Sequence, residues 1–528
     1  MANRELFRNG RGTAHPADTV NAAGGFAYAF EPRHALAQLA ATGCLNDTYY
    51  ESAEKQLETV LELCETLPAE FVAKTAVYAR RRGAMKDMPA LLCAFLSRVA
   101  PELLEKVFPS VVDSGRMLRT FVQILRSGAC GRRSLGTRPK RLIQRWFAER
   151  GPDEVFFAAT GNNPSFSDII RLAHPRPDTP EREALYKWLL GYKVAAESLP
   201  RRAGNYVAWK ESRAAGGTAA GELPDAPFLW LLGCGLTRGE MIELTPRLPW
   251  TALRMNLVAL ARAGVFTDAA TAELVAGRLT DREEIARTRV FPYQLFQTAL
   301  AIHGDKGVPA SVRNAVAQAL EISLESAPLF AGKKAYVLVD VSGSMGAPVT
   351  GHRKGATSAT RCIDAAALMA TAILHRNPGS VVVPFENHVV PLFIDAENGV
   401  FENARKLASV GGGGTNTCAP LRQLNQRKAT GDVVIYLSDN QSWMDSRRHQ
   451  WNQGTKTLAE WEAFRARNPG AKLVCVDFQP YPDSQALDRE DILNVGGFSD
   501  AVFERITTFV QGGENPEHWL EAIERIEL

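Results

Sequence analysis

The chain has no long apolar run, and this absence excludes several classes of protein. No segment approaches the ~18–20 consecutive apolar residues that a transmembrane helix needs. The first residues, MANRELFRNGRGTAHP, contain no apolar stretch that could act as a signal peptide. We therefore expect a soluble cytoplasmic protein that makes no contact with a membrane.

Cysteine is scarce and poorly spaced for a zinc site or a disulfide framework. The eight cysteines are scattered over 528 residues, and no two of them form a C-x-x-C pair. Zinc ribbons need such pairs, and disulfide scaffolds belong to short secreted chains. The cysteines are therefore expected to be reduced thiols.

The chain also has no excess of charge of either sign. Lysine and arginine number 61 and aspartate and glutamate 58, which gives a net charge of +3. Any site for an acidic partner must therefore come from local clustering of basic residues. Because single hydrophobic cores rarely grow beyond ~250–300 residues, a chain of this length predicts two or more domains.

Motifs of catalysis are missing as well. The sequence has no nucleophile–base motif and no H-x-x-x-H pair, and the glycine run 411–414 is followed by Thr415 and Asn416, where a phosphate-binding loop needs lysine. Asp340 and Asp439 could in principle hold a catalytic metal for phosphoryl transfer, but their hydroxyl-rich neighbourhood favours binding. We therefore expect that the protein is not an enzyme.

The helical pattern dominates the first part of the chain. Residues 1–25 are polar and rich in glycine and alanine, which predicts an N-terminal arm. From 26 to 330, apolar residues recur at helical spacing, for example in 54–67, 69–83 and 90–108, and many of these stretches end in Gly or Pro. Helices this numerous must stack on one another, so we predict HEAT-like helical repeats.

The pattern changes near residue 331, where strands begin to alternate with helices. KKAYVLVDVSGSM (333–345) predicts a buried strand that runs into a polar loop, and a helix should follow from about Ser358 to His375. Three further apolar runs lie at 380–390, 432–440 and 471–481. This alternation predicts an α/β domain over 331–528, with a mostly parallel sheet covered on both faces.

Five oxygen-bearing side chains are placed to meet at one edge of this sheet. Asp340, Ser342 and Ser344 follow the first strand, Asp439 follows the strand VVIYL, and Thr415 ends the glycine run. Ligands of open α/β sheets bind outside the carboxyl ends of the strands. A set of oxygens suits a hard cation, most simply Mg²⁺ with water completing ~6 ligands, or else Mn²⁺ or Ca²⁺. We expect the hydroxyls to bind directly and the carboxylates largely through water.

The alternative for this loop is structural, with Asp340 capping a helix in a serine-rich turn. Against it stand the distant threonine and the second aspartate at a strand end. D-x-S-x-S with such a threonine and aspartate resembles the metal-ion-dependent adhesion site of von Willebrand factor A domains. The resemblance implies that the open coordination position accepts a carboxylate from a protein partner.

A second candidate site is a basic segment in the helical part. Between Arg116 and Arg150 there are ten basic residues and one acidic residue, Glu149. Arginine forks can bind two phosphate oxygens at once, so the segment has the charge expected of a nucleic-acid site. The alternative is a solvated basic face paired with acidic residues from elsewhere. The candidate RNA contacts here are Arg116, Arg119, Arg132, Arg133, Arg138, Lys140, Arg141 and Arg145.

The two parts together resemble the Ro autoantigen family in its bacterial form, which joins a ring of HEAT-like repeats, the TROVE module, to a von Willebrand factor A domain of Rossmann-like fold. The resemblance covers about residues 26–528 and implies a TROVE domain over 26–330 and an adhesion-type metal site in 331–528. It rests on the metal motif and on DTYY (47–50), AVYARRRGAMKDMPALL (76–92), SFSDIIRLAHPRP (165–177), LPWTALRMNL (248–257) and VFPYQLFQTAL (290–300).

What the resemblance implies is RNA binding without catalysis. Ro proteins bind small noncoding Y RNAs on the outer face of the ring and single-stranded 3′ ends of misfolded RNAs through its central hole. In bacteria the RNA tethers them to a 3′ exoribonuclease, in RNA quality control, RNA degradation and stress survival. We expect a monomer.

The resemblance also adds two candidate RNA contacts. His174 aligns with a histidine that the family uses for Y RNA, and Arg171 accompanies it. The preceding helix departs from the vertebrate pattern, because Phe157, Ala158, Ala159 and Gly161 stand where basic residues are found. The cluster from Arg132 to Arg145 is therefore expected to carry more of the binding. The alternative function is a metal-dependent protein-interaction module that grips an acidic partner without RNA.

Overall fold

The computed structural model describes residues 15–214, 222–325, 327–352, 360–444, 454–497, 500–512 and 518–528. These residues form two compact units. One is helical and comprises 68–290, 294–323 and 526–528, and the other contains the sheet and comprises the described parts of 1–67, 291–293 and 324–525. The predicted fold class, helical repeats followed by an α/β domain, is confirmed.

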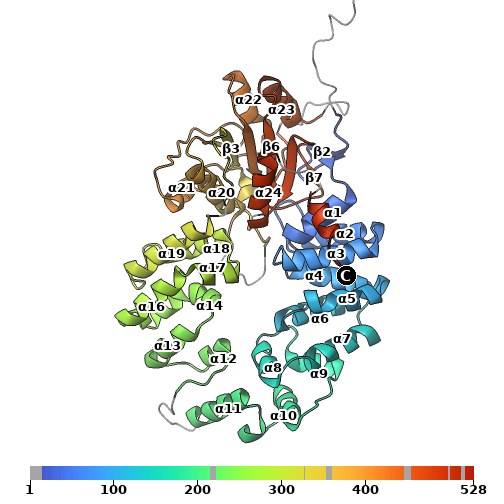
Figure 1. Cartoon of the computed structure of the whole chain (residues 1–528), viewed down its shortest axis with the longest axis vertical. Helices are drawn as coiled ribbons and strands as arrows, with labels where there is room; N and C mark the ends of the chain where they lie inside the picture. Colours follow the sequence, from blue (N-terminus) through green and yellow to red (C-terminus); the bar gives the residue numbers. More distant parts are fainter. Residues whose placement is uncertain are drawn as a thin grey trace, which may run out of the picture. The chain divides into compact units, whose positions relative to one another are not determined.

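The helical unit is a succession of helices that pack on their neighbours in the sequence (Figure 1). One hydrogen bond joins residues of this unit that are far apart in the sequence. Arg289, which follows α17 (Arg282–Thr288), donates from Nη1 to the carbonyl oxygen of Arg81 at the end of α3, 2.7 Å away. Its elements are α3 (Ala69–Arg81), α4 (Asp87–Val99), α5 (Pro101–Val111), α6 (Gly115–Ser127), α7 (Thr137–Ala148), α8 (Pro152–Ala158), α9 (Phe166–Ala173), α10 (Pro180–Leu189), α11 (Arg201–Ala214), α12 (Phe228–Leu232), α13 (Arg238–Leu244), α14 (Trp250–Met255), α15 (Leu257–Arg262), α16 (Ala269–Leu279), α17, α18 (Pro292–Ile302) and α19 (Ala310–Ser323).

Helix α6 shows how the sequence specifies these elements. The Ser114 side chain caps its start by accepting from the Met117 amide, and Gly128 ends it in a left-handed conformation with φ of 91°. Between them, residues at helical spacing are buried, namely Met117, Leu118, Phe121, Val122 and Leu125. The remaining face keeps its arginines, which is why the basic segment lies on the surface of the unit.

The sheet unit has five parallel strands in the order β4-β3-β5-β6-β8. They are β3 (Ala335–Asp340), β4 (Val381–Phe385), β5 (Val433–Ser438), β6 (Lys472–Asp477) and β8 (Ile492–Gly496). Helix α20 (Cys362–Arg376) packs on β3, β4 and β5 and is buried from Cys362 to Leu374. The other helices are α21 (Val400–Leu407), α22 (Cys418–Gln426), α23 (Lys456–Arg467), α24 (Asp500–Val510) and α25 (His518–Glu524). Strands β3 and β5 are buried throughout, as a sheet covered on both faces requires.

The described residues before 68 pack with the sheet rather than with the helical repeats. Strand β2 (Phe26–Ala29) pairs with β1 (Thr19–Val20) and with β7 (Asp483–Ser484) in a small antiparallel sheet. Helix α1 (Pro32–Thr42) lies against β8, so closely that a Cβ on Gly496 would come within 2.6 Å of the Thr42 hydroxyl oxygen. Helix α2 (Ala53–Thr66) follows.

This packing differs from the predicted domain limits in one respect. The prediction began the helical domain at residue 26, whereas residues 26–67 belong to the sheet unit. Of the predicted N-terminal arm, residues 1–14 lie outside the described residues, and residues 15–25 are docked: Asn21 donates from Nδ2 to the Ser442 carbonyl oxygen at 2.9 Å. The helix expected from Ser358 begins, within the described residues, at Cys362.

Candidate metal centre and nucleic-acid surface

The two predicted carboxylates lie side by side at the carboxyl edge of the sheet. Asp340 is the last residue of β3, and Asp439 directly follows β5, its hydrogen-bonded neighbour. Both side chains are completely buried. The parallel pairing of β3 with β5 therefore places two carboxylates, 99 residues apart in sequence, in one pocket.

The three predicted hydroxyls complete this group. Ser342 Oγ lies 3.2 Å from Ser344 Oγ and accepts from Thr415 Oγ1 at 3.0 Å. Ser344 in turn hydrogen-bonds to the Asp439 side chain. The structure thus brings all five predicted residues together.

The glycine run is what allows Thr415 to approach the other ligands. The Gly412 amide donates to the Val341 carbonyl at 2.8 Å, and the Gly343 amide donates to the Gly413 carbonyl at 2.9 Å. A Cβ on Gly411 would lie 2.0 Å from the Val341 oxygen, and the φ of Gly411 is 97°, so no other residue type fits there. The run predicted from sequence therefore holds two loops in backbone contact.

The electrostatics of the pocket suit a cation. Burial, followed by the nearby charge of Asp439, raises the pKa of Asp340 to about 7, and burial raises the pKa of Asp439 as well. Asp439 Oδ2 has no hydrogen-bond partner. Neighbouring buried carboxylates are costly unless a positive charge compensates them. A divalent cation would compensate both and would also use the unpartnered oxygen.

The composition of the donor set narrows the choice of metal. No group of three or more His, Cys, Asp or Glu side chains with metal-binding geometry occurs among the described residues. The site offers two carboxylates and three hydroxyls, so it lacks the nitrogen and sulfur ligands that zinc prefers. Few anionic ligands with room for water are typical of Mg²⁺.

One residue that positions the carboxylates was missed by the sequence analysis. The Ser438 hydroxyl donates to Asp340 Oδ2 at 2.7 Å, while the Ser342 amide donates to Oδ1 at 2.9 Å. Both oxygens of Asp340 are therefore fixed. The available signal was the position of Ser438 as the last residue of a buried strand, immediately before Asp439.

The basic segment forms a surface stripe on α7. Arg138, Arg141 and Arg145 are exposed along one face, while Leu142, Ile143, Trp146 and Phe147 bury the other. Arg138 pairs with Glu102 and Arg145 pairs with Glu105, both at 2.9 Å. These ion pairs agree with the alternative interpretation of the segment, a solvated basic face paired with acidic residues from elsewhere in the chain. Because exposed pairs contribute only ~0–1 kcal/mol, a phosphate can replace either glutamate at little cost.

The remaining candidates of the segment divide into two kinds. Arg119 and Arg132 are half-buried and donate to carbonyl oxygens, Arg119 to that of Ala158 at 3.2 Å and Arg132 to that of Ser97 at 2.8 Å. They fasten neighbouring helices together. Within the described residues, no ion pair is formed by Arg116, Arg133, Lys140 or Arg141, and of these only Lys140 is less than fully exposed.

His174 and Arg171 lie at the C-terminal end of α9, next to α7. His174 caps α9 in a left-handed conformation with φ of 50°, and its side chain is exposed. Gln144 of α7 donates from Nε2 to the carbonyl oxygens of Ala173 and His174, at 2.7 and 3.3 Å. Arg171 donates to the Leu190 carbonyl oxygen at 3.2 Å. The end of α9 is therefore held beside the α7 stripe, although Gln144 and His174 lie 30 residues apart in the sequence.

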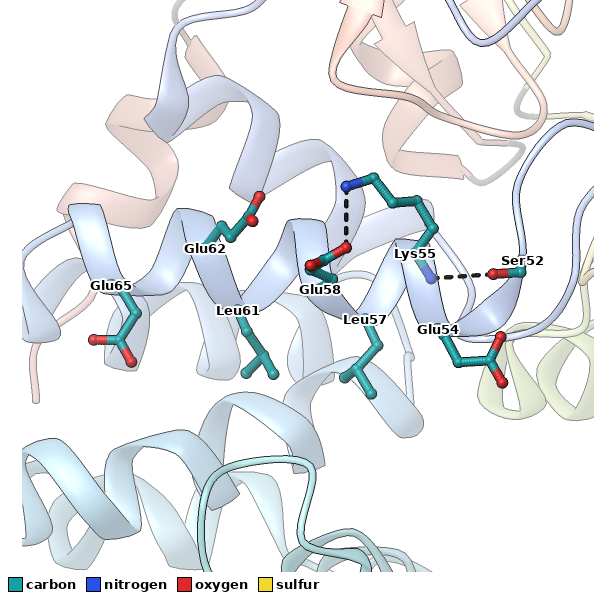
Figure 2. Close-up of a pocket in the computed structure, with 8 residues that line it drawn as sticks. All are labelled: Ser52, Glu54, Lys55, Leu57, Glu58, Leu61, Glu62 and Glu65. Carbon is teal, nitrogen blue, oxygen red and sulfur yellow. Dashed lines mark hydrogen bonds and ion pairs between the residues drawn. The ribbon is translucent and has the colours of Figure 1, made fainter.

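The sheet unit carries a groove of the opposite charge. It is lined by α2 and the residue before it, and Figure 2 shows Leu57 and Leu61 pointing to the same side of the helix, with glutamates around them. The only lining base is Lys55, which pairs with Glu58 at 3.1 Å. Phosphate would be repelled here, so the α7 stripe is the better candidate for RNA. The lining residues are Ser52, Glu54, Lys55, Leu57, Glu58, Leu61, Glu62 and Glu65.

Two family profiles match the chain. Residues 240–324 match the TROVE domain, and residues 334–510 match the Ro60 vWA domain. The chain is 27% identical over 524 residues to the RNA-binding protein RO60 of Deinococcus radiodurans, which spans 93% of this chain and 95% of the relative. It is also 27% identical over 275 residues to the RNA-binding protein RO60 of Caenorhabditis elegans, across 50% of this chain and 40% of that protein.

The fold has a counterpart among solved structures. The crystal structure of the Deinococcus radiodurans Ro (RSR) protein matches with a TM-score of 0.58 and 20% sequence identity, over 92% of this chain and 100% of that one. At this identity the match establishes the fold alone. Within the described residues, no helix is both long and apolar enough to cross a bilayer.

Proposed function

We propose, from the premise that this chain belongs to the Ro family, that it is an RNA-binding scaffold without catalytic activity. Relatives from a bacterium and from a nematode are both named RNA-binding proteins. The observation that carries the proposal in this chain is the exposed stripe Arg138, Arg141 and Arg145 on α7, with His174 held beside it. Its guanidinium groups are spaced along a helix face, where successive phosphates of a folded RNA can be bound.

The finer features of this function are part of the same proposal. The RNA bound at the stripe is a small noncoding Y RNA, and single-stranded ends of misfolded RNA bind elsewhere on the helical unit. A 3′ exoribonuclease is recruited through the RNA, and the protein acts as a cytoplasmic monomer in RNA quality control. Support comes from the family membership and from the exposed arginines of the basic stripe.

The metal centre is the second element of the proposal. Ser342, Ser344 and Thr415 would hold Mg²⁺ directly, and Asp340 and Asp439 would act largely through water. When bound, the cation supplies a positive charge that can hold an anionic oxygen. The support is the burial of both carboxylates and the unpartnered oxygen of Asp439. The two relatives named RNA-binding proteins favour RNA binding over a protein-interaction module that works without RNA.

The RNA-binding surface can be tested with a triple variant of basic residues that make no ion pair with another described residue. Arg133→Gln, Lys140→Gln and Arg141→Gln together remove three positive charges and should weaken binding of a Y-like RNA at least tenfold. Each lost phosphate contact should also reduce the slope of log K against log salt by ~0.7–0.9. Filter binding across a salt series measures both quantities.

The matched control removes the same charge from the sheet unit. Arg405→Gln, Arg427→Gln and Lys428→Gln are exposed substitutions that should leave the salt slope unchanged. If the two triple variants lose affinity equally, attraction to net charge explains the binding and the cluster from Arg132 to Arg145 is not the site.

A further inference from the structure

The segment 46–50, Asn-Asp-Thr-Tyr-Tyr, lies against the loop that follows the metal-binding serines. The His352 amide donates to the Asp47 carbonyl oxygen at 2.6 Å, and Asn46 donates from Nδ2 to the Thr350 carbonyl oxygen at 2.7 Å. The contact is close: a Cβ on Gly351 would lie 2.8 Å from Asn46 Cβ. The segment is thus fastened to the edge of the sheet at which the five oxygens meet.

The segment is also fixed by hydrogen bonds with helix α2, which follows it in the chain, and with Tyr481. Asp47 Oδ1 accepts from the Ala53 amide at the start of α2 at 2.8 Å, and Gln56 of α2 donates from Nε2 to the Asn46 carbonyl oxygen at 2.8 Å. The Thr48 hydroxyl lies 3.1 Å from the Tyr481 hydroxyl oxygen. These bonds make a short rigid turn, since its backbone is held from α2 as well as from the sheet.

The turn brings Tyr50 onto the metal centre. Its side chain is half-buried, and its ring packs edge-to-face on Tyr481 with 6.4 Å between the centroids. Its hydroxyl group hydrogen-bonds to Ser344 and Thr415, two of the three hydroxyls proposed to bind the cation. The ordinary pKa of a tyrosine hydroxyl is about 10, so the group at the site is a neutral phenol.

We propose that Tyr50 and the segment 46–50 form a lid over the open coordination position of the metal centre, so that a carboxylate from outside reaches the cation only when this lid is displaced. The inference rests on the proposed metal centre and refines it. A neutral phenol is a hydrogen-bond donor of the right kind to face an anionic or water oxygen held by the cation. The neighbouring Tyr49 is 56% exposed and lies outside these contacts with the hydroxyl ligands.

Bound Mn²⁺ provides the test, because water-proton relaxation reports how freely solvent exchanges at the ion. Wild-type full-length protein loaded with Mn²⁺ should show low relaxivity that acetate does not change. Tyr50→Ala should raise the relaxivity, and acetate should then lower it by taking the exposed position. Loss of two hydrogen bonds of ordinary net strength predicts roughly tenfold faster release of Mn²⁺.

Further variants separate a lid from a general loss of structure. Tyr50→Phe keeps the ring on Tyr481 and should still release Mn²⁺ several-fold faster, whereas Tyr49→Phe should behave as wild type. Asn46→Ala, which removes only the bond to Thr350, should also speed release.

Two results would overturn the inference, and they can be told apart. Wild-type relaxivity and acetate response in both Tyr50 variants would show that the cation has no lid at this residue. Absence of Mn²⁺ binding by the wild-type chain would remove the metal centre itself, and the lid with it.

Discussion

Asp483 offers a test of how the small antiparallel sheet is held to the α/β core. This residue of β7 pairs in register with Ala29 of β2 and is 7% exposed, and its Oδ1 has no hydrogen-bond partner. Burial raises the pKa of Asp483 from 3.8 to about 7. The folded protein therefore binds this proton more tightly than the unfolded chain does.

The sign and size of the effect follow from that shift. An acid whose pKa is raised by folding destabilises the fold progressively as pH rises from about 4 to about 7, and the penalty is constant above that. Each pH unit by which folding raises the pKa costs ~1.4 kcal/mol. The rise from 3.8 to about 7 therefore destabilises the folded protein by about 4 kcal/mol at pH 8 and by about 1–2 kcal/mol at pH 5. Asp483→Asn, which cannot ionise, should therefore stabilise the sheet unit, and more so at pH 8 than at pH 5.

Hydrogen exchange of the β5 and β6 amides, followed by mass spectrometry without divalent cations, measures the opening free energy of this unit alone. This choice matters because a chain with two compact units need not unfold in one step. Glu490→Gln is the matched control, since Glu490 is an exposed carboxylate in the same region. The reasoning is refuted if Asp483→Asn does not stabilise the sheet unit at pH 8, or if the stabilisation is no larger at pH 8 than at pH 5.

Three further predictions concern the two sites. Asp340→Ala should abolish Mg²⁺ and Mn²⁺ binding by the full-length chain in titration calorimetry, because both oxygens of Asp340 are oriented for the site; unchanged affinity would place the metal elsewhere. Ser342→Ala with Ser344→Ala should leave RNA affinity within about tenfold of wild type, or ~1.4 kcal/mol, at fixed Mg²⁺, because these ligands and the α7 stripe lie in separate compact units; a larger loss in filter binding would make the metal centre a regulator of RNA binding. His174→Ser should weaken binding of a Y-like RNA with less effect on the salt slope than the triple variant of Arg133, Lys140 and Arg141, because one histidine side chain displaces fewer counterions than three permanently charged side chains; an equal drop in slope would contradict this.

Much of the metal centre could be predicted from local patterns. The run AYVLVD has the continuous burial of a parallel strand, and the same holds for VVIYLS, so their carboxyl ends had to share one edge of a sheet. That geometry alone brings Asp340 and Asp439 together, and the glycine run marks where Thr415 must approach closely. The fifth strand, Ile492–Gly496, was not predicted, because its ILNVG sequence mixes asparagine and glycine with only three apolar residues.

The sequence predicted the cluster of basic residues, but it did not predict the role of each residue in that cluster. The sequence could not show that Glu102 and Glu105 of α5 pair with Arg138 and Arg145, because these partners are 36 and 40 residues away and meet only when α5 packs on α7. Nor could it separate these exposed arginines from Arg132, whose guanidinium binds a carbonyl oxygen. Charge composition gives the number of basic groups, and packing decides which of them face solvent.

The sequence by itself determined that a helical array precedes an α/β domain and which five residues meet at the candidate cation site, because periodicity and strand ends are local properties. Only the tertiary structure decided that residues 15–67 belong with the sheet, since β1 and β7 are two residues long and Asn21 finds its partner 421 positions away. The same packing decides the surroundings of the metal centre. DTYY gives no local signal of a site, and Tyr50 reaches Ser344 and Thr415 because bonds from α2 and from the loop 350–352 hold its turn in place.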